Sequence, residues 1–278
     1  MLEVLQYGFM QNAVLATCLT CIACGVIGVF VVSKKIVSIT GGISHAGFGG
    51  IGLSYYLGLD PLLGLLPFSL LSAVVLGFLS RRTKVSEDTA NGILWSMGVA
   101  FGIVLIYLTP GYAPDLMTYL FGNILTVPSS DIYLMIAIDV VILITVLLLF
   151  KEFLTLCFDE EYVRASGIPA EMLYMVLLCL IALTIVAMIK VVGIILIIAM
   201  LTVPASLSRR LSHNMKHMMI ISAVLGTIMS LAGLAFSYLF DLPSGATIIL
   251  VMGVVYLAAV GVSEIYERIR RPENNENI

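Results

Sequence analysis

Long apolar stretches dominate this chain, and the short polar segments between them hold almost all of its basic residues. Nine such stretches can be traced, at about residues 12–33, 43–58, 62–80, 91–109, 131–150, 172–189, 192–208, 218–239 and 245–266. Roughly 20 apolar residues form a helix that crosses about 30 Å of hydrocarbon, and most of the stretches approach that length. The pattern predicts an integral membrane protein.

The fold class follows from the same stretches. The chain is 60% hydrophobic and 11% charged, and its mean hydropathy is +1.11. Backbone groups in hydrocarbon must be hydrogen-bonded internally, and the strand-like alternation of a membrane barrel is absent. We therefore expect an all-α bundle of about nine transmembrane helices, as one domain over residues 1–278, with a disordered tail over residues 272–278.

The basic residues predict an orientation, because Lys and Arg resist translocation across the membrane. If the N-terminus is external, only Lys190 among the fourteen basic residues lies outside. The other thirteen fall in inner segments: Lys34, Lys35, Arg81, Arg82, Lys84, Lys151, Arg164, Arg209, Arg210, Lys216, Arg268, Arg270 and Arg271. We expect a multi-pass protein of a bacterial or archaeal cytoplasmic membrane, with the N-terminus outside and the C-terminus in the cytoplasm.

His45 is the one histidine within a predicted span, in the segment GGISHAGFGGIGLSYYLG. Small residues such as these glycines let neighbouring helices approach closely in lipid. A neutral imidazole is a common ligand for borderline metals, so His45 is a candidate metal ligand. The alternative is a packing histidine that is hydrogen-bonded to a neighbouring helix.

Asp139 is the one carboxylate near the middle of a predicted span. Such a group costs about 2.5–3.5 kcal/mol on insertion scales, so it should face protein or water rather than lipid. A role in an ion pathway and a purely structural role with a nearby hydroxyl group are both open.

The inner segment FDEEYVRASGIP predicts a short amphipathic helix. Three acidic residues lie near its start, where the helix dipole favours negative charge, and Gly167 and Pro169 end it. Such a helix could dock on a cytoplasmic partner, or it could be a solvated connection. The residues concerned are Asp159, Glu160, Glu161, Arg164 and Gly167.

Four segments together resemble one known family. ITGGISHAGFGGIGL resembles the second-helix motif GDAISHAxxPGxxL of the zinc and manganese ABC importer permeases, and FDEEYVRASGIP looks like their coupling segment, here about residues 157–169. KVVGIILIIAMLTVPAS and DLPSGATIILVMG are similar to two later blocks of the family. Their order and spacing also fit, over nearly the whole chain.

The resemblance implies eight or nine helices around a central path, related to the cobalamin and siderophore permeases. It also implies a homodimer in lipid, on ATP-binding subunits that contact the coupling residues, with metal delivered by an extracytoplasmic solute-binding protein. No nucleic acid is implied. The chain has no G-x-x-x-x-G-K-[ST] loop, so we expect a transport subunit that is not an enzyme, binds no cofactor and leaves ATP to its partner.

The chain departs from the family motif at one position. The motif pairs an Asp with a His four residues later, whereas here Gly41 precedes His45. Loss of a hard oxygen ligand disfavours manganese and favours zinc, although Asp139 could supply an oxygen from another helix. We predict an importer of divalent transition metal ions, with zinc as the cargo and manganese or iron(II) as alternatives, and with His45 and Asp139 as metal residues.

The sequence also bears on two other function classes. A proton- or sodium-coupled secondary transporter would also use glycine-broken helices and a buried carboxylate, with Asp139 as the proton site. An intramembrane hydrolase would want H-E-x-x-H or G-x-S-x-G, and neither motif occurs in the sequence.

Overall fold

The computed structural model describes residues 6–110, 116–194 and 196–270, and its described elements are helices. The long helices are α1 (Gly8–Lys34), α2 (Val37–Leu57), α3 (Pro61–Arg82), α4 (Glu87–Leu108), α6 (Ser129–Leu148), α9 (Ala170–Val192), α10 (Ile197–Leu211), α11 (Met215–Phe240) and α12 (Ser244–Arg270). Short elements lie between them: α5 (Leu116–Phe121), the 3₁₀ helix η2 (Ile124–Thr126), α7 (Phe150–Phe158) and α8 (Glu160–Ala165). The predicted all-α class is confirmed for this part of the chain.

The predicted number of membrane spans is not confirmed. Seven of the described helices are long and apolar enough to cross a membrane, namely α1, α3, α4, α6, α9, α11 and α12. The other two predicted stretches correspond to α2 and α10. Helix α2 has 21 residues, but its many glycines and its histidine dilute its hydropathy, and α10 has only 15 residues. The predicted tail at 272–278 lies outside the described residues.

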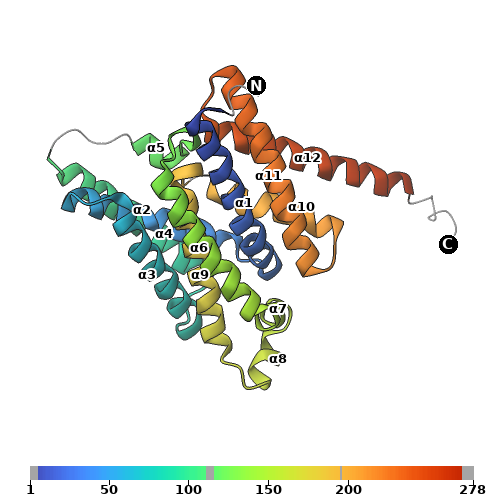
Figure 1. Cartoon of the computed structure of the whole chain (residues 1–278). Helices are drawn as coiled ribbons and strands as arrows, with labels where there is room; N and C mark the ends of the chain where they lie inside the picture. The colour runs from blue at the N-terminus through green and yellow to red at the C-terminus, as the bar shows by residue number, and fades with distance from the viewer. Residues whose placement is uncertain (1–5, 111–115, 195, 271–278) are drawn as a thin grey trace, which may run out of the picture.

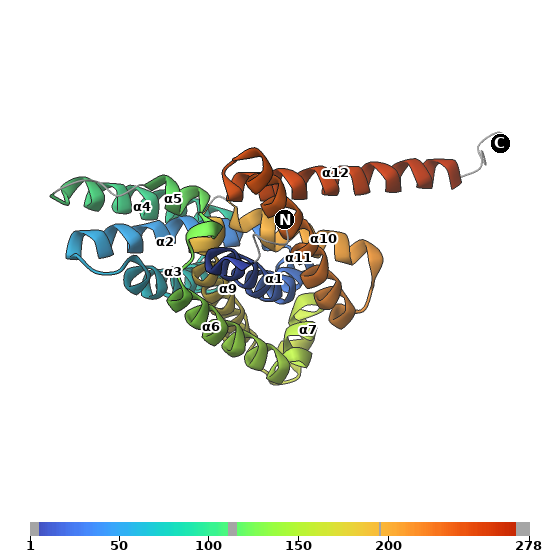
Figure 2. The same cartoon turned by 45° about the horizontal axis from the view of Figure 1, so that its top comes forward.

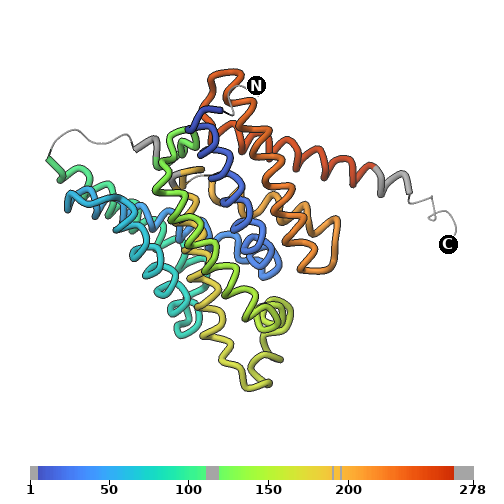
Figure 3. The backbone as a smooth tube through the Cα atoms, in the orientation of Figure 1, coloured from blue at the N-terminus to red at the C-terminus, as the bar shows by residue number. Residues whose placement is uncertain are grey.

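The helices form a bundle with two distinct ends (Figure 1). Helices α7 and α8 lie at one end, here called the α8 end, and the start of α1 lies with α5 at the opposite end (Figures 1 and 3). Helices α2, α3 and α4 lie together on one side of α9, whereas α12 projects away from the bundle in both views (Figures 1 and 2). This arrangement places the predicted coupling segment, which contains α8, at one end of the bundle, and His45 in α2 beside α3 and α4.

Helix α4 approaches α2 at backbone distance, as the glycine content of α2 predicts. A Cβ atom added to Gly98 would overlap the backbone of Ala46, and one added to Gly52 would overlap the backbone of Gly102. This close contact brings the side chains of α4 over the face of α2 that carries His45.

An interruption separates α9 from α10, within the apolar sequence KVVGIILII. Gly193 ends α9 with a φ of +81°, a backbone conformation that favours glycine. Its Cα lies against the backbone of Gly122, where a side chain would clash, and the nitrogen of Ile194 donates to the oxygen of Tyr119 over 3.0 Å. Helix α10 consequently begins afresh at Ile197, close to α2.

Candidate metal route and coupling segment

His45 is held by the backbone of its own helix. Its Nδ1 atom lies 2.8 Å from the carbonyl oxygen of Gly41, one turn earlier in α2. A carbonyl oxygen only accepts, so Nδ1 carries the hydrogen and donates it, and the lone pair of the neutral ring is on Nε2. Histidines that bind metals commonly use one ring nitrogen in this way to orient the other.

Trp95 of α4 covers the imidazole ring. The centroids of the two rings are 4.0 Å apart and their planes are inclined by 27°. His45 is half-buried, and Trp95 remains 39% exposed. The ring of His45 is therefore fixed from two helices while its surroundings stay partly open. Sequence reasoning missed Trp95, because a single tryptophan carries no spacing signal.

Gly41 marks the position at which the family motif carries its aspartate. A Cβ atom added to Gly41 would lie 3.0 Å from Cδ1 of Ile198 and 3.6 Å from Cζ3 of Trp95. The position therefore faces the first turn of α10 and the same tryptophan that covers His45. Without a carboxylate at position 41, the candidate metal ligand on this turn of α2 is the ring nitrogen of His45.

Asp139 lies in α6 and is only 4% exposed. Neither of its carboxyl oxygens has a hydrogen-bond partner among the described residues. Helix α6 packs mainly on α1 and α9, whereas α2 packs mainly on α3 and α4. No hydrogen bond joins Asp139 to His45 in this part of the chain, so their joint metal role stays a prediction.

A complete metal site is not found within the described part of one chain. The described residues contain no group of three or more His, Cys, Asp or Glu side chains that could hold a metal ion. Two cysteines of α1 are hydrogen-bonded within the bundle and are not part of such a group. Cys24 donates to the sulfur of Met188 over 3.1 Å, and the sulfur of Cys21 lies 3.5 Å from the hydroxyl oxygen of Ser230. A metal held at His45 would need further ligands from elsewhere.

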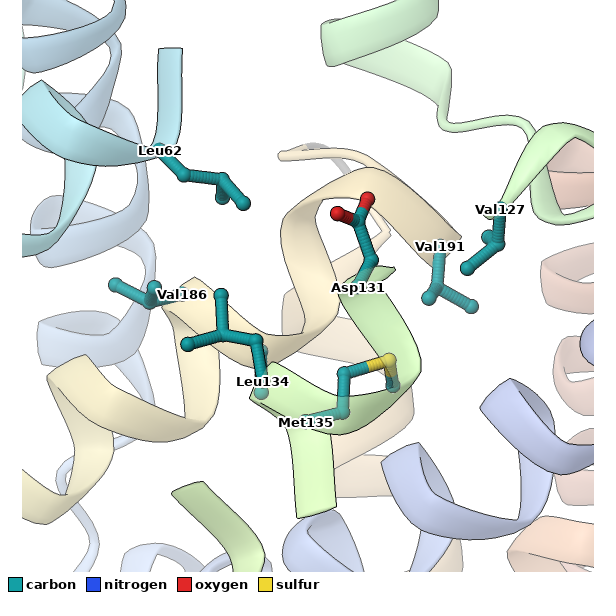
Figure 4. Close-up of a pocket in the computed structure, with 8 residues that line it drawn as sticks. Leu62, Val127, Asp131, Leu134, Met135, Val186 and Val191 are labelled. Atoms are coloured by element: carbon teal, nitrogen blue, oxygen red, sulfur yellow. The ribbon is translucent and has the colours of Figure 1, made fainter. Parts of the chain in front are cut away.

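The described residues also include a small pocket at the end opposite α8. Figure 4 shows the carboxylate of Asp131 among the apolar side chains that line it. The lining residues are Leu62, Val127, Asp131, Leu134, Met135, Val186, Ala187 and Val191. Asp131 lies in the first turn of α6, where the helix dipole favours an acidic side chain. Neither predicted metal residue lines this pocket.

The predicted coupling segment forms the short helix α8. The Oδ1 atom of Asp159 caps it by accepting the backbone hydrogen of Tyr162 over 2.9 Å. Gly167 follows the helix with a φ of +77°, which explains a glycine at this turn. Glu161 and Arg164 point to solvent. Four of the five predicted coupling residues therefore either shape α8 or lie on its surface.

Glu160 differs from the other four because its carboxylate is turned toward the bundle. Lys34 Nζ donates to Oε2 over 2.8 Å, and the guanidinium of Arg81 donates to both oxygens over 2.5 and 3.2 Å. Arg164 adds a contact of 3.0 Å within α8. Burial alone would raise the pKa of Glu160, but the hydrogen bonds and charges of Lys34 and Arg81 outweigh burial and lower the pKa to about 2.

Comparison with known proteins adds the family. The model of the ABC 3 transport family matches residues 6–263. The uncharacterized membrane protein slr2045 of Synechocystis sp. is 45% identical over 260 residues, which cover 94% of this chain and 92% of that protein. The manganese transport system membrane protein MntC of Halalkalibacterium halodurans is 34% identical over 257 residues, 92% and 88% of the two chains. The solved structure titled PsaBC from Streptococcus pneumoniae in complex with Fab has a TM-score of 0.84 at 32% identity and covers 93% of both chains.

Proposed function

This chain belongs to the ABC 3 transport family as a multi-pass permease of a metal-ion importer that is not itself an enzyme, and we propose that its cargo is zinc. The orientation of His45 carries the proposal. Because Nδ1 donates to Gly41, Nε2 is left as a nitrogen ligand on a helix that lacks the neighbouring carboxylate. Imidazole suits zinc, whereas carboxylate and water oxygens suit manganese.

Ligands beyond His45 would come from a second copy of the chain in the homodimer. His45 and Trp95 are both partly exposed in a single copy, which is expected of groups that meet a partner or line a path. A transported ion must also be bound weakly enough to leave, so a sparse ligand set suits a route better than a closed site.

The partner subunits and the orientation of the importer follow from the family and from the distribution of basic residues. An ATP-binding subunit docks at the α8 end on the cytoplasmic side, and a solute-binding protein delivers metal at the opposite end. ATP hydrolysis by the partner replaces the proton or sodium coupling of a secondary transporter. Labelling of single cysteines placed at Lys84, Lys216 and the C-terminus in intact cells tests this orientation, and labelling of the C-terminus from outside would refute it.

The cargo is tested with the complete complex in liposomes. His45→Ala and His45→Asn are expected to abolish or strongly reduce ATP-dependent zinc uptake, because neither alanine nor an amide is a good zinc ligand. His217→Ala is the matched control, since it removes an exposed histidine. Zinc uptake by His45→Ala at the unmodified rate would show that His45 is a packing residue.

Manganese is the second candidate, and the names of the relatives favour it. The MntC protein of Halalkalibacterium halodurans is named for manganese transport and aligns with most of this chain. Uptake of labelled zinc in the presence of excess manganese, and the reverse experiment, separate the two candidates. The proposal predicts that zinc displaces manganese and that manganese does not displace zinc.

A further inference from the structure

The ion pairs of Glu160 lie between the short helix α8 and the ends of two long helices. Lys34 is in the last turn of α1, and Arg81 is in the last turn of α3. The side chains of Lys34, Arg81 and Glu160 are only 14%, 16% and 21% exposed. Charge-assisted hydrogen bonds that are shielded from water in this way are the stronger ones. Arg164 is 57% exposed, so its contact with Glu160 adds little.

Lys34 also holds the end of α7. Its Nζ atom donates to the carbonyl oxygen of Leu156 over 2.8 Å, in the last turn of α7. One ammonium group thus satisfies a terminal carbonyl of α7 and pairs with the first residue of α8. Both contacts have the sign that the helix dipoles favour. The end of α1 is therefore joined to both short helices.

Arg81 extends the contacts into the bundle. Its guanidinium carbon lies 4.0 Å from the centroid of the Tyr174 ring in α9, and the Tyr174 hydroxyl donates to Glu87 of α4 over 3.2 Å. Helix α4 is also the helix whose Trp95 covers His45. A continuous series of contacts therefore runs from α8 through α3 and α9 to α4.

Helix α8 has few other attachments. It has six residues, which is too short for a helix to be stable on its own. Val163 is its one fully buried side chain, and Glu161, Tyr162 and Arg164 are exposed. The exposed side chains are available to a partner, whereas the carboxylate of Glu160 is paired with Lys34 and Arg81 of the bundle.

We propose that Glu160 is the joint through which α8 moves together with α1 and α3, and hence a positioning residue for the coupling of ATP hydrolysis to metal transport. Its partners are in this chain, so it does not dock the ATP-binding subunit directly. The inference rests on the proposed function, in which that subunit binds at α8.

The test uses the complete complex in liposomes and measures metal taken up per ATP hydrolysed. Glu160→Gln keeps the shape of the side chain but loses the charge that Lys34 and Arg81 share. We expect this variant to retain the ATP-binding subunit and to hydrolyse ATP, while metal uptake per ATP falls several-fold. Glu264→Gln is the matched control, since it makes the same change at an exposed position of α12 outside the coupling segment, and it should keep the unmodified ratio. Glu160→Asp keeps the charge on a shorter side chain, so its metal uptake per ATP should lie between that of Glu160→Gln and that of the unmodified complex.

A double-variant comparison separates the joint from general damage. Arg81→Gln removes the other partner of the Arg81–Glu160 ion pair. If the two residues act through that pair, the double variant Arg81→Gln/Glu160→Gln should have a metal uptake per ATP no lower than that of the worse single variant. Additive losses, or an unmodified ratio in Glu160→Gln, would overturn the proposal. Loss of the ATP-binding subunit from Glu160→Gln would also overturn it, because Glu160 would then be needed for docking itself.

The uptake measurement also distinguishes failure of the proposed function from failure of the role proposed for Glu160. The ratio is measured first with zinc and, if the unmodified complex does not carry zinc, with manganese. An unmodified complex that carries neither metal with ATP would refute the proposed function, whereas a normal unmodified ratio that Glu160→Gln leaves unchanged would refute only the joint.

Discussion

His45 donates its Nδ1 hydrogen to the carbonyl oxygen of Gly41 over 2.8 Å, so the backbone of Gly41 orients the imidazole ring that carries the candidate ligand nitrogen. Both are on the face of α2 that meets Trp95. The two positions that the family motif gives to an Asp and a His are therefore adjacent in space here, and His45 is the one of the two with a side chain that could bind a metal. Changes at these positions and at Trp95 can separate ligand chemistry from packing.

Gly41→Asp is expected to fold and to shift the preference toward manganese. The new Cβ atom would lie 3.0 Å from the tip of the Ile198 side chain, which can move by a few tenths of an ångström. A carboxylate beside His45 would add the hard oxygen ligand that manganese favours. We expect the ratio of manganese to zinc uptake in liposomes to rise by roughly tenfold, equivalent to about 1.4 kcal/mol.

Gly41→Ala is the control for this substitution, since it adds the Cβ atom without the carboxylate. Its uptake ratio should match that of the unmodified protein. An equal shift in both variants would mean that packing, and not ligand chemistry, sets the preference.

Trp95→Ala is expected to weaken zinc transport because the imidazole of His45 loses the ring that fixes its plane. Aromatic pairs contribute about 0.5–1.5 kcal/mol beyond area burial, which corresponds to roughly a two- to tenfold loss of apparent zinc affinity. The initial uptake rate as a function of zinc concentration measures this loss. Trp95→Phe should retain most of the affinity, and Met97→Ala, at an exposed position of the same helix, should have no effect. Equal affinities for Trp95→Ala and Trp95→Phe would contradict the role.

Asp139→Asn should distinguish a structural role of Asp139 from a role in the metal route. The carboxyl group is buried and has no hydrogen-bond partner among the described residues, so a neutral amide of the same shape should raise the thermal unfolding midpoint in detergent. If Asp139 contributes to the metal route, zinc uptake should fall at the same time, but less than in His45→Ala. A more stable variant with full uptake would assign Asp139 to structure alone.

Hydropathy predicted the helices well, because each long apolar stretch coincides with one helix. It could not give the number of spans, since α2 is diluted by glycine and α10 is short. Hydropathy also gives no physical reason for the break between α9 and α10. The break depends on the backbone of Gly193 meeting that of Gly122, and those residues are far apart in the chain.

The candidate sites were predicted less completely than the fold. Motif spacing made His45 a candidate ligand and predicted the short helix α8, because those signals are local. The inward orientation of Glu160 depends on Lys34 and Arg81, which are 126 and 79 residues away in sequence. Such pairs are set by how the helix ends meet, and a single sequence contains no spacing that indicates them.

Acid titration gives a final prediction for Glu160. Its pKa is lowered from 4.5 to about 2, so the carboxylate stabilises the folded state fully above pH 4.5, and this contribution is lost as the pH falls toward 2. The cations that face it, Lys34, Arg81 and Arg164, stay charged throughout this range. At pH 7 we expect Glu160→Gln to be less stable by about 1.5–3 kcal/mol, the range for hydrogen bonds to charged groups. Thermal unfolding in detergent at pH 7, 5, 4 and 3 should show this gap narrowing below pH 4.5, while Glu161→Gln stays close to the unmodified protein. A gap that does not change with pH would mean that the ion pairs of Glu160 do not stabilise the fold.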